Sequence, residues 1–131
     1  MTKGGCRCGA VRYELSGDPY FTALCHCPDC RASVGAPMVA WAMYPEDALA
    51  LTGTPKAHAS SPGVERRFCG DCGTALLFTA DYIEGLVDVT IASMDDPSAM
   101  PPVAHIWDRH RLDWMNSLDT LEAHAETPPQ E

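Results

Sequence analysis

The sequence Cys25-His26-Cys27-Pro28-Asp29-Cys30 places three cysteines within six residues. Three thiols cannot all be paired in disulfides, and thiolates this close together repel each other unless a cation lies among them. The spacing therefore favours a soft divalent metal, zinc first. Three protein ligands leave the fourth tetrahedral position open, and an open position is typical of a catalytic rather than a structural zinc.

Four further cysteines occur as two close pairs, Cys6-Arg7-Cys8 and Cys69-Gly70-Asp71-Cys72. The total of seven cysteines is odd, which argues against a disulfide framework. The two pairs together supply four ligands, which suits a closed zinc site, and the group of three cysteines suits an open one. The glycine-containing turn of the second pair is typical of a zinc knuckle, in which backbone N–H groups point at the sulfurs.

The spacing also allows a second arrangement of the cysteines. The two CxxC sequences can share one zinc, as in an ordinary zinc ribbon, through Cys27, Cys30, Cys69 and Cys72. Three cysteines then remain unassigned, namely Cys6, Cys8 and Cys25. On that interpretation the protein has one structural zinc and no active site.

Length and charge restrict the class of protein. At 131 residues the chain has the length of one domain that can bury its own core. Eighteen acidic and nine basic residues give a net charge of −9, which argues against nucleic-acid and membrane partners and leaves small molecules open. No apolar run approaches the ~18 residues of a membrane-spanning helix, and residues 1–5 lack the apolar segment of a signal peptide. We therefore expect a cytoplasmic protein, in which clustered cysteines indicate metal binding or catalysis.

Short runs of strand composition between turn residues predict a mainly β fold with short helical turns at most. Alternating apolar residues predict a strand over 11–15 that begins near the first cysteine pair, so Cys6 and Cys8 are expected to share one strand face. Further strands are predicted over 20–25, 38–44, 64–68, 74–79 and 86–93. Residues 56–61 are interpreted as a polar stretch. We expect one zinc-binding β domain over residues 1–121 and a polar C-terminal tail over 122–131.

Six motifs carry a resemblance to a known family. They are Gly5-Cys6-Arg7-Cys8-Gly9-Ala10-Val11, Cys25-His26-Cys27-Pro28-Asp29-Cys30-Arg31, Gly35-Ala36-Pro37, Ser60-Ser61-Pro62-Gly63, Arg67-Phe68-Cys69-Gly70-Asp71-Cys72-Gly73-Thr74 and His105-Ile106-Trp107. Together they resemble the glutathione-dependent formaldehyde-activating enzyme family, also called the centromere-protein-V-like family. The resemblance runs from about residue 5 to residue 121. It departs from the family near its end, where Asp119-Thr120-Leu121-Glu122 replaces the common Asp-Gly-Leu-Pro.

This resemblance implies a fold, two metal sites and a reaction. The implied fold is a zinc-stabilised, mainly antiparallel β structure of the Mss4-like or β-tent type. The implied ligands of a structural zinc are Cys6, Cys8, Cys69 and Cys72, and those of a catalytic zinc are Cys25, Cys27 and Cys30. The implied reaction joins glutathione and formaldehyde to give S-(hydroxymethyl)glutathione.

An open zinc with three thiolates suits this chemistry, because it can bind a thiol as thiolate beside an aldehyde. We therefore expect a carbon–sulfur lyase, or thiol–aldehyde adduct synthase, acting on glutathione or a similar thiol and on formaldehyde or another small electrophile. Two other classes remain open. One is a non-enzymatic zinc-stabilised binding module, and the other is a thiol redox protein that uses Cys27-Pro28-Asp29-Cys30. No feature of the sequence predicts an oligomeric state.

Four residues near these motifs are candidate substrate contacts. Arg31 can bind a carboxylate with its planar guanidinium, although a salt bridge explains it equally well. His26 lies between two ligands and is expected to point away from their shared face, which favours a structural role over proton transfer. His105 and Trp107 are candidates for the pocket wall, although core packing is the more common role of such residues.

Overall fold

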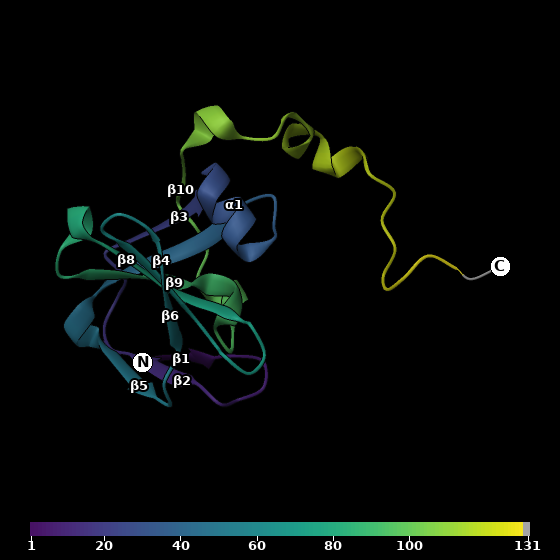
Figure 1. Cartoon of the computed structure of the whole chain (residues 1–131). Helices are drawn as coiled ribbons and strands as arrows, with labels where there is room; N and C mark the ends of the chain where they lie inside the picture. Colours follow the sequence, from purple (N-terminus) through teal and green to yellow (C-terminus); the bar gives the residue numbers. More distant parts are fainter. Residues whose placement is uncertain (130–131) are drawn as a thin grey trace.

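Ten strands in two sheets and one α-helix form the fold in the computed structural model, which describes residues 1–129 (Figure 1). The mainly β class expected from the sequence is confirmed. The last two positions of the expected tail over 122–131 lie outside the described residues. The elements in chain order are β1 (Thr2–Gly5), β2 (Arg12–Leu15), β3 (Phe21–Cys25), α1 (Pro28–Val34), β4 (Val39–Pro45), β5 (Leu49–Thr52), β6 (Lys56–Ser61), β7 (Val64–Phe68), β8 (Ala75–Ala80), β9 (Leu86–Thr90) and β10 (Ala104–Ile106).

The small sheet has three antiparallel strands in the order β1-β2-β5. Its central strand β2 has the alternating pattern that was expected, with Tyr13 and Leu15 almost completely buried. Tyr13 donates to or accepts from Ser93 Oγ at 2.8 Å, so its buried hydroxyl has a partner.

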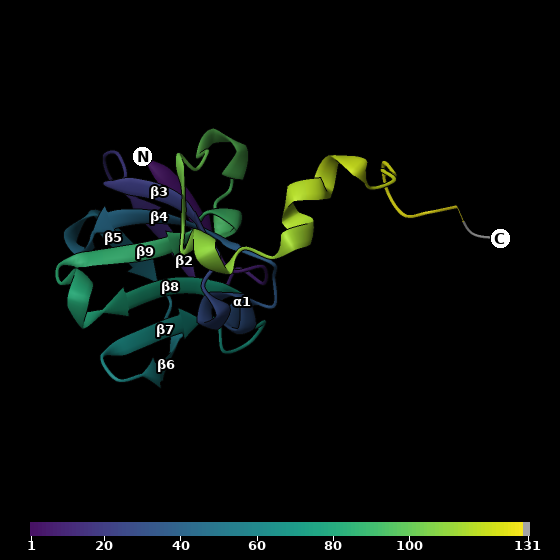
Figure 2. The same cartoon turned by 90° about the horizontal axis from the view of Figure 1, so that it is seen from above.

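The large sheet has seven strands in the order β10-β3-β4-β9-β8-β7-β6 (Figure 2). Strand β4 is apolar on both faces, which is typical of a strand covered on both sides, whereas β9 has Val87 and Val89 on one face and Asp88 on the other. All of its pairs are antiparallel except β10 with β3, which is parallel. This parallel edge brings residues 104–106 beside the strand that ends in Cys25.

Each face of the large sheet has its own apolar core. One face packs against the small sheet through side chains that include Ala42, Tyr44, Val87 and Val89. The opposite face is covered by α1, and its buried side chains include Val39, Trp41, Phe78 and Ala80 together with Cys25 and Cys30. Because side chains alternate along a strand, neighbouring residues of β4 contribute to different cores.

Helix α1 is short because its ends are defined by the sequence. Pro28 occupies its first turn, where the missing N–H costs nothing. Gly35 ends it in the left-handed conformation with φ of 69°, and the Gly35 N–H donates to Arg31 O at 2.8 Å. Six short 3₁₀ turns complete the described structure: Glu46–Ala48, Asp81–Ile83, Ile91–Ser93, Pro97–Ala99, Asp108–His110 and Asp113–Thr120.

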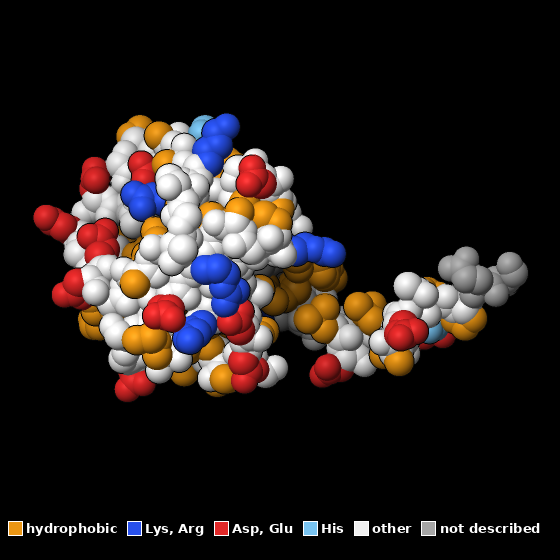
Figure 3. All heavy atoms as spheres, turned by 90° about the horizontal axis from the view of Figure 1, so that it is seen from below, with side chains coloured by type: hydrophobic (Ala, Val, Ile, Leu, Met, Phe, Trp, Pro, Cys, Tyr) orange, Lys and Arg blue, Asp and Glu red, His pale blue; other side chains and the backbone are white. Residues whose placement is uncertain are grey.

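The chain beyond residue 112 leaves the body as an extended arm (Figure 3). The arm contains the 3₁₀ segment Asp113–Thr120, and its large apolar side chains Trp114, Leu118 and Leu121 are exposed by 55%, 45% and 64%. The projecting segment therefore starts earlier than the polar tail that the sequence predicted.

Candidate active site and metal centres

Two cysteine pairs that are far apart in the sequence meet in one cluster. The sulfur atoms of Cys6, Cys8, Cys69 and Cys72 all lie within 4.8 Å of one another. Cys6 Sγ lies 3.6 Å from Cys8 Sγ, and Cys8 Sγ lies 3.7 Å from Cys69 Sγ. A tetrahedral zinc with Zn–S bonds of about 2.3 Å separates its sulfurs by about 3.8 Å. The four cysteines therefore fit a closed, four-thiolate zinc site.

Loops position these four sulfurs. Cys6 and Cys8 lie in the loop between β1 and β2, and the other two cysteines lie in the turn between β7 and β8. The expectation that Cys6 and Cys8 share a strand face is wrong. Strand β1 ends at Gly5, and the chain then reverses with a hydrogen bond of 2.9 Å from Cys6 N–H to Val11 O.

Hydrogen-bond donors surround the sulfurs of this cluster. The Val11 N–H donates to Cys6 Sγ at 3.2 Å, and the Thr74 hydroxyl lies 3.2 Å from Cys72 Sγ. The hydrogen bond from Thr74 is the main reason why the pKa of Cys72 is lowered to about 5. A lowered thiol pKa favours the thiolate, which is the form that binds zinc.

The other three cysteines lie around the start of α1. Cys25 ends β3, Cys27 immediately precedes α1, and Cys30 lies in its first turn. Cys25 and Cys30 are buried, whereas Cys27 is half-buried. A hydrogen bond between Cys25 and Cys30 raises the pKa of Cys25 and lowers the pKa of Cys30 to about 6. The pair therefore shares one thiolate.

The sulfurs of these three cysteines do not form a tight group. Within residues 1–129, the groups of three or more ligand atoms that lie mutually within 4.8 Å are the four-cysteine cluster and His26 with His105 and Asp108. The sulfurs of Cys25, Cys27 and Cys30 are therefore more widely spread. All three nevertheless pack in the same apolar cluster, and no capping hydrogen bond holds the Cys27 side chain. Their soft donor set suits zinc.

Cys30 is surrounded by groups from the large sheet. Arg66 Nη2 donates to Cys30 Sγ at 3.5 Å, and the Arg66 guanidinium lies 4.9 Å from the centre of the Phe78 ring. Strand pairing places Arg66, Phe78 and Asp88 in one row across β7, β8 and β9. Burial, and then the negative charge of Cys30, raises the pKa of Asp88 to about 7.

Arg66 and Asp88 were not among the residues singled out from the sequence. A signal for each was present, because side chains alternate between the faces of a strand. In β7, Arg66 shares a face with Val64 and Phe68, which places a charge on an otherwise apolar face. In β9, Asp88 lies between Val87 and Val89 and is the charged residue on the other face of this strand.

His26 and His105 contact each other. His26 is completely buried, its Nε2 lies 2.9 Å from His105 Nδ1, and the two rings stack with centres 5.1 Å apart. Burial is the main reason why the pKa of His26 is lowered. The contact joins β10 to the residues between the two ligand candidates Cys25 and Cys27.

Arg31 and Trp107 also lie at this end of the molecule. Arg31 Nη1 donates to the main-chain oxygens of His26 and His110, both at 2.6 Å. Trp107 is 52% exposed, adopts φ of 52°, and lies 5.4 Å from the Arg109 guanidinium. The structure thus places Arg31 in a main-chain clamp and Trp107 at the surface, and their proposed contact with substrate remains a prediction.

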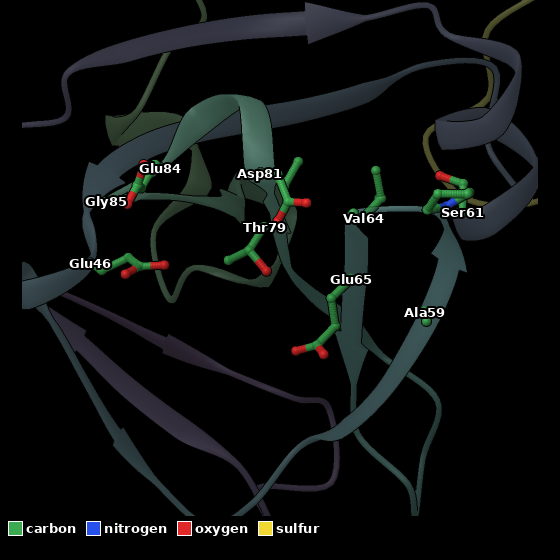
Figure 4. A pocket seen from close by; sticks show the side chains of 12 residues that line it. Glu46, Ala59, Ser61, Val64, Glu65, Thr79, Asp81, Glu84 and Gly85 are labelled. Carbon is green, nitrogen blue, oxygen red and sulfur yellow. The ribbon is translucent and has the colours of Figure 1, made fainter.

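A hollow of about 910 Å³ lies elsewhere on the surface. It runs between β6, β7 and the Asp81–Ile83 turn, and four carboxylates line it, those of Glu46, Glu65, Asp81 and Glu84 (Figure 4). It contains no cysteine or histidine. Its chemistry therefore does not suit the binding of a thiol or an anion.

Comparisons with known proteins identify the family to which this chain is similar. The sequence model described as "glutathione-dependent formaldehyde-activating enzyme" matches residues 1–110. The chain belongs to the glutathione-dependent formaldehyde-activating enzyme family. A Halomonas elongata protein whose name assigns it provisionally to this enzyme is 30% identical over 128 residues, which cover 88% of this chain and 80% of that protein.

Two further proteins are similar to this chain. A Schizosaccharomyces pombe protein named an uncharacterized lyase is 30% identical over 76 residues, which span 58% of this chain and only 56% of that protein. The crystal structure of a Rhodobacter sphaeroides protein has the same fold, with a TM-score of 0.64 and 21% identity, covering 79% of this chain and 98% of that one. The family and the lyase names support a lyase-type enzyme in general. Over residues 1–129, every helix is too short to cross a bilayer.

Proposed function

We propose that this protein is a zinc-dependent carbon–sulfur lyase that joins a glutathione-type thiol to formaldehyde, or to another small aldehyde, and also catalyses the reverse cleavage. One observation carries the proposal. Cys25, Cys27 and Cys30 belong to one cluster of packed apolar side chains under α1 that is separate from the four-cysteine cluster, and a guanidinium contacts Cys30. The description of the family supports the choice of substrates.

The two groups of cysteines have different roles in this proposal. Cys6, Cys8, Cys69 and Cys72 hold a structural zinc with complete coordination. The other three cysteines hold a catalytic zinc, which, when bound, supplies an open position for a thiolate.

The reaction has a simple balance of atoms. One bond forms between the thiol sulfur and the aldehyde carbon, and the thiol proton ends on the aldehyde oxygen. The reverse reaction breaks the carbon–sulfur bond and returns the proton to sulfur. We assign Asp88 to hold this proton, because a carboxyl group with a pKa of about 7 exchanges a proton readily near neutral pH. The buried Trp41 ring packs in the same apolar cluster as the three cysteines.

Zinc content and thiol–aldehyde exchange test this function together. We expect about two zinc ions per chain and faster exchange of formaldehyde between its free and thiol-bound forms, measured at equilibrium by NMR exchange spectroscopy. The variant Cys27→Ala is expected to lose one zinc and the exchange activity. Its circular dichroism should stay close to that of the wild type, because Cys27 is only half-buried and lies outside the four-cysteine cluster. An unchanged zinc content in Cys27→Ala rejects the assignment.

A thiol redox function is the second candidate, and one observation favours it. Cys27 and Cys30 lie at the start of α1, and the pKa of Cys30 is lowered to about 6, as in reactive CxxC sequences. The same metal count separates the two functions. A protein purified without zinc, whose Cys27 and Cys30 form a reversible disulfide, has the redox function.

A further inference from the structure

A cavity of about 320 Å³ lies between the end of α1 and the large sheet. Its walls are mostly apolar and include Val34, Trp41, Phe68 and Leu77. Its polar lining residues are Ser33, His58, Arg66 and Arg67. Apolar walls with a few convergent polar groups are typical of a small-molecule site, and the volume is at the lower end of the usual range.

Arg66 has an incomplete set of partners in this cavity. Its Nη2 donates to Cys30 Sγ, but its Nε is buried and has no hydrogen-bond partner among the described residues. Within residues 1–129, no carboxylate lies within 4.0 Å of it. A buried donor without an acceptor lowers the stability of the folded state, and the loss is larger for a charged guanidinium than for a neutral group. The geometry is that of a binding group whose anionic partner comes from solution.

The neighbouring arginine shows the contrast. Arg67 Nε donates to Glu65 Oε1 at 2.9 Å, so this guanidinium already has a carboxylate partner. The chain has eighteen acidic residues, twice the number of its basic ones. Among the described residues, four of the seven arginines have no carboxylate within 4.0 Å, but only in Arg66 does a buried guanidinium nitrogen also lack any hydrogen-bond partner.

His58 extends the same binding surface. It lies directly opposite Arg66 in the pairing of β6 with β7, so both side chains project from the same face of the sheet. An imidazole beside a guanidinium adds a second donor for an anion. Arg66 also contacts Cys30, so this one side chain connects the cavity, whose lining contains no cysteine, to the three-cysteine group.

We propose that Arg66, with His58 beside it, binds a carboxylate of the thiol substrate. This inference rests on the proposed function, because it assumes that the substrate sulfur lies at Cys25, Cys27 and Cys30. The planar guanidinium offers its free Nε–H and a neighbouring N–H to the two oxygens of a carboxylate. The enzyme is then selective for thiols that carry a carboxylate, such as glutathione, over neutral thiols of similar reactivity.

A binding experiment tests this without any turnover. The zinc-loaded protein is titrated calorimetrically with S-methylglutathione, which has the carboxylates but no free thiol. We expect binding by the wild type and a loss of affinity of about tenfold or more in Arg66→Gln, because one charge-assisted pair is removed. Arg12→Gln is the matched control. This variant removes a guanidinium of the small sheet that pairs with Asp95, so the same charge is lost away from the cavity. It should bind S-methylglutathione like the wild type. Equal affinity in wild type and Arg66→Gln, or an equal loss in both variants, overturns the inference.

An exchange experiment separates this inference from the proposed function. The rate enhancement is compared for glutathione and for 2-mercaptoethanol, which has no carboxylate. Arg66→Gln should lose at least about tenfold more of its enhancement with glutathione than with 2-mercaptoethanol, whereas an equal loss with both thiols, as general damage at Cys30 would give, overturns the inference. His58→Gln, on an exposed edge strand, should change the ratio in the same direction even if Arg66→Gln does not fold. A wild type that accelerates neither reaction disproves the proposed function instead.

Discussion

Single charged residues in the face under α1 carry much of the proposed chemistry. Arg66 and Asp88 lie in one row of the sheet, on either side of Phe78, and both act electrostatically on Cys30 or respond to it. Ionised groups are costly to bury, so a fold retains them where they serve a purpose. These two residues are therefore where the chemistry of the site departs most from that of an ordinary apolar core.

Asp88 makes the stability of the protein depend on pH. Its pKa in the folded protein is about 7, well above the value of about 3.9 in an unfolded chain. The folded state therefore binds the proton more tightly, and the free energy of unfolding falls as the pH rises between these two values. Asp88→Asn imitates the protonated form. We expect its stability gain over the wild type to grow by about 2 kcal/mol between pH 5.5 and pH 8.

Thermal melting at several pH values measures this effect, and Asp95→Asn is the control. Arg12 donates hydrogen bonds to the Asp95 carboxylate, and these bonds are the main reason why the pKa of Asp95 is lowered. Its contribution is fully present above the unfolded pKa, so Asp95→Asn should lose the same stability at pH 5.5 and at pH 8. A gain in Asp88→Asn that does not change with pH contradicts the assignment of a raised pKa.

Turns between strands hold the closed cysteine cluster in place. Gly53 follows β5 with φ of 85°, and a Cβ atom there would collide with the carbonyl oxygen of Ala10, in the loop that carries Cys6 and Cys8. Gly17 has a similar φ of 73°, but a Cβ atom there would meet nothing within 4 Å. Two glycines with the same backbone conformation thus differ in the space around them.

Alanine at these two positions separates backbone strain from crowding. We expect Gly17→Ala to lower the free energy of unfolding by about 1 kcal/mol, the cost of a left-handed conformation. Gly53→Ala should lose roughly 2 kcal/mol or more and also weaken zinc retention, because the loop must move. Urea unfolding at fixed zinc concentration measures both. Equal losses in the two variants would show that the Ala10 carbonyl can move away from the new methyl group without a further loss of stability.

Strand patterns in the sequence predicted most of the elements. Runs that are buried on at least one face, such as β2, β4 and β9, were found because burial imposes an apolar pattern. Strand β6 was interpreted as a polar stretch, because every residue of this edge strand is exposed and no apolar pattern marks it. The β1 strand was missed for a related reason, since two of its four residues are glycine. The parallel pairing of β10 depends on contacts between distant segments, which local patterns do not contain.

At the scale of the whole molecule, the four-cysteine cluster joins the two sheets. It connects the loop between β1 and β2 of the small sheet to the turn between β7 and β8 of the large sheet. A metal that binds only the folded state stabilises it by its full binding free energy. The three-cysteine group lies within one face of the large sheet and makes no such connection.

Loss of one ligand in each group should therefore have unequal effects. We expect Cys72→Ser to lower the melting temperature by on the order of 10 °C, because the link between the sheets is weakened. Cys27→Ala should lower it much less. A chelator should bring the wild type close to Cys72→Ser. Similar melting temperatures for the two variants contradict the assignment of the four-cysteine cluster as the structural site.

The candidate site was predictable from the sequence only in part. Clustered cysteines are visible in a sequence, because few roles other than metal binding or redox chemistry explain them. Arg66 and His58 are ordinary surface residue types, and only the pairing of β6 with β7 shows that they face the same cavity. Cavities are formed by elements distant in sequence, so the residues that choose a substrate are the hardest to find.

The clamp made by Arg31 has a consequence for protein synthesis. Arg31 donates to the main chain of His110, which lies 79 residues later, and β10 beside Cys25 is also among the last strands. A ribosome releases the N-terminal half first. The Cys25–Cys30 segment thus emerges long before the backbone that holds it exists, and its thiols are bare to the cell for most of translation. If this segment holds zinc as proposed, we expect the metal to be bound stably only after the chain around His110 has been synthesised.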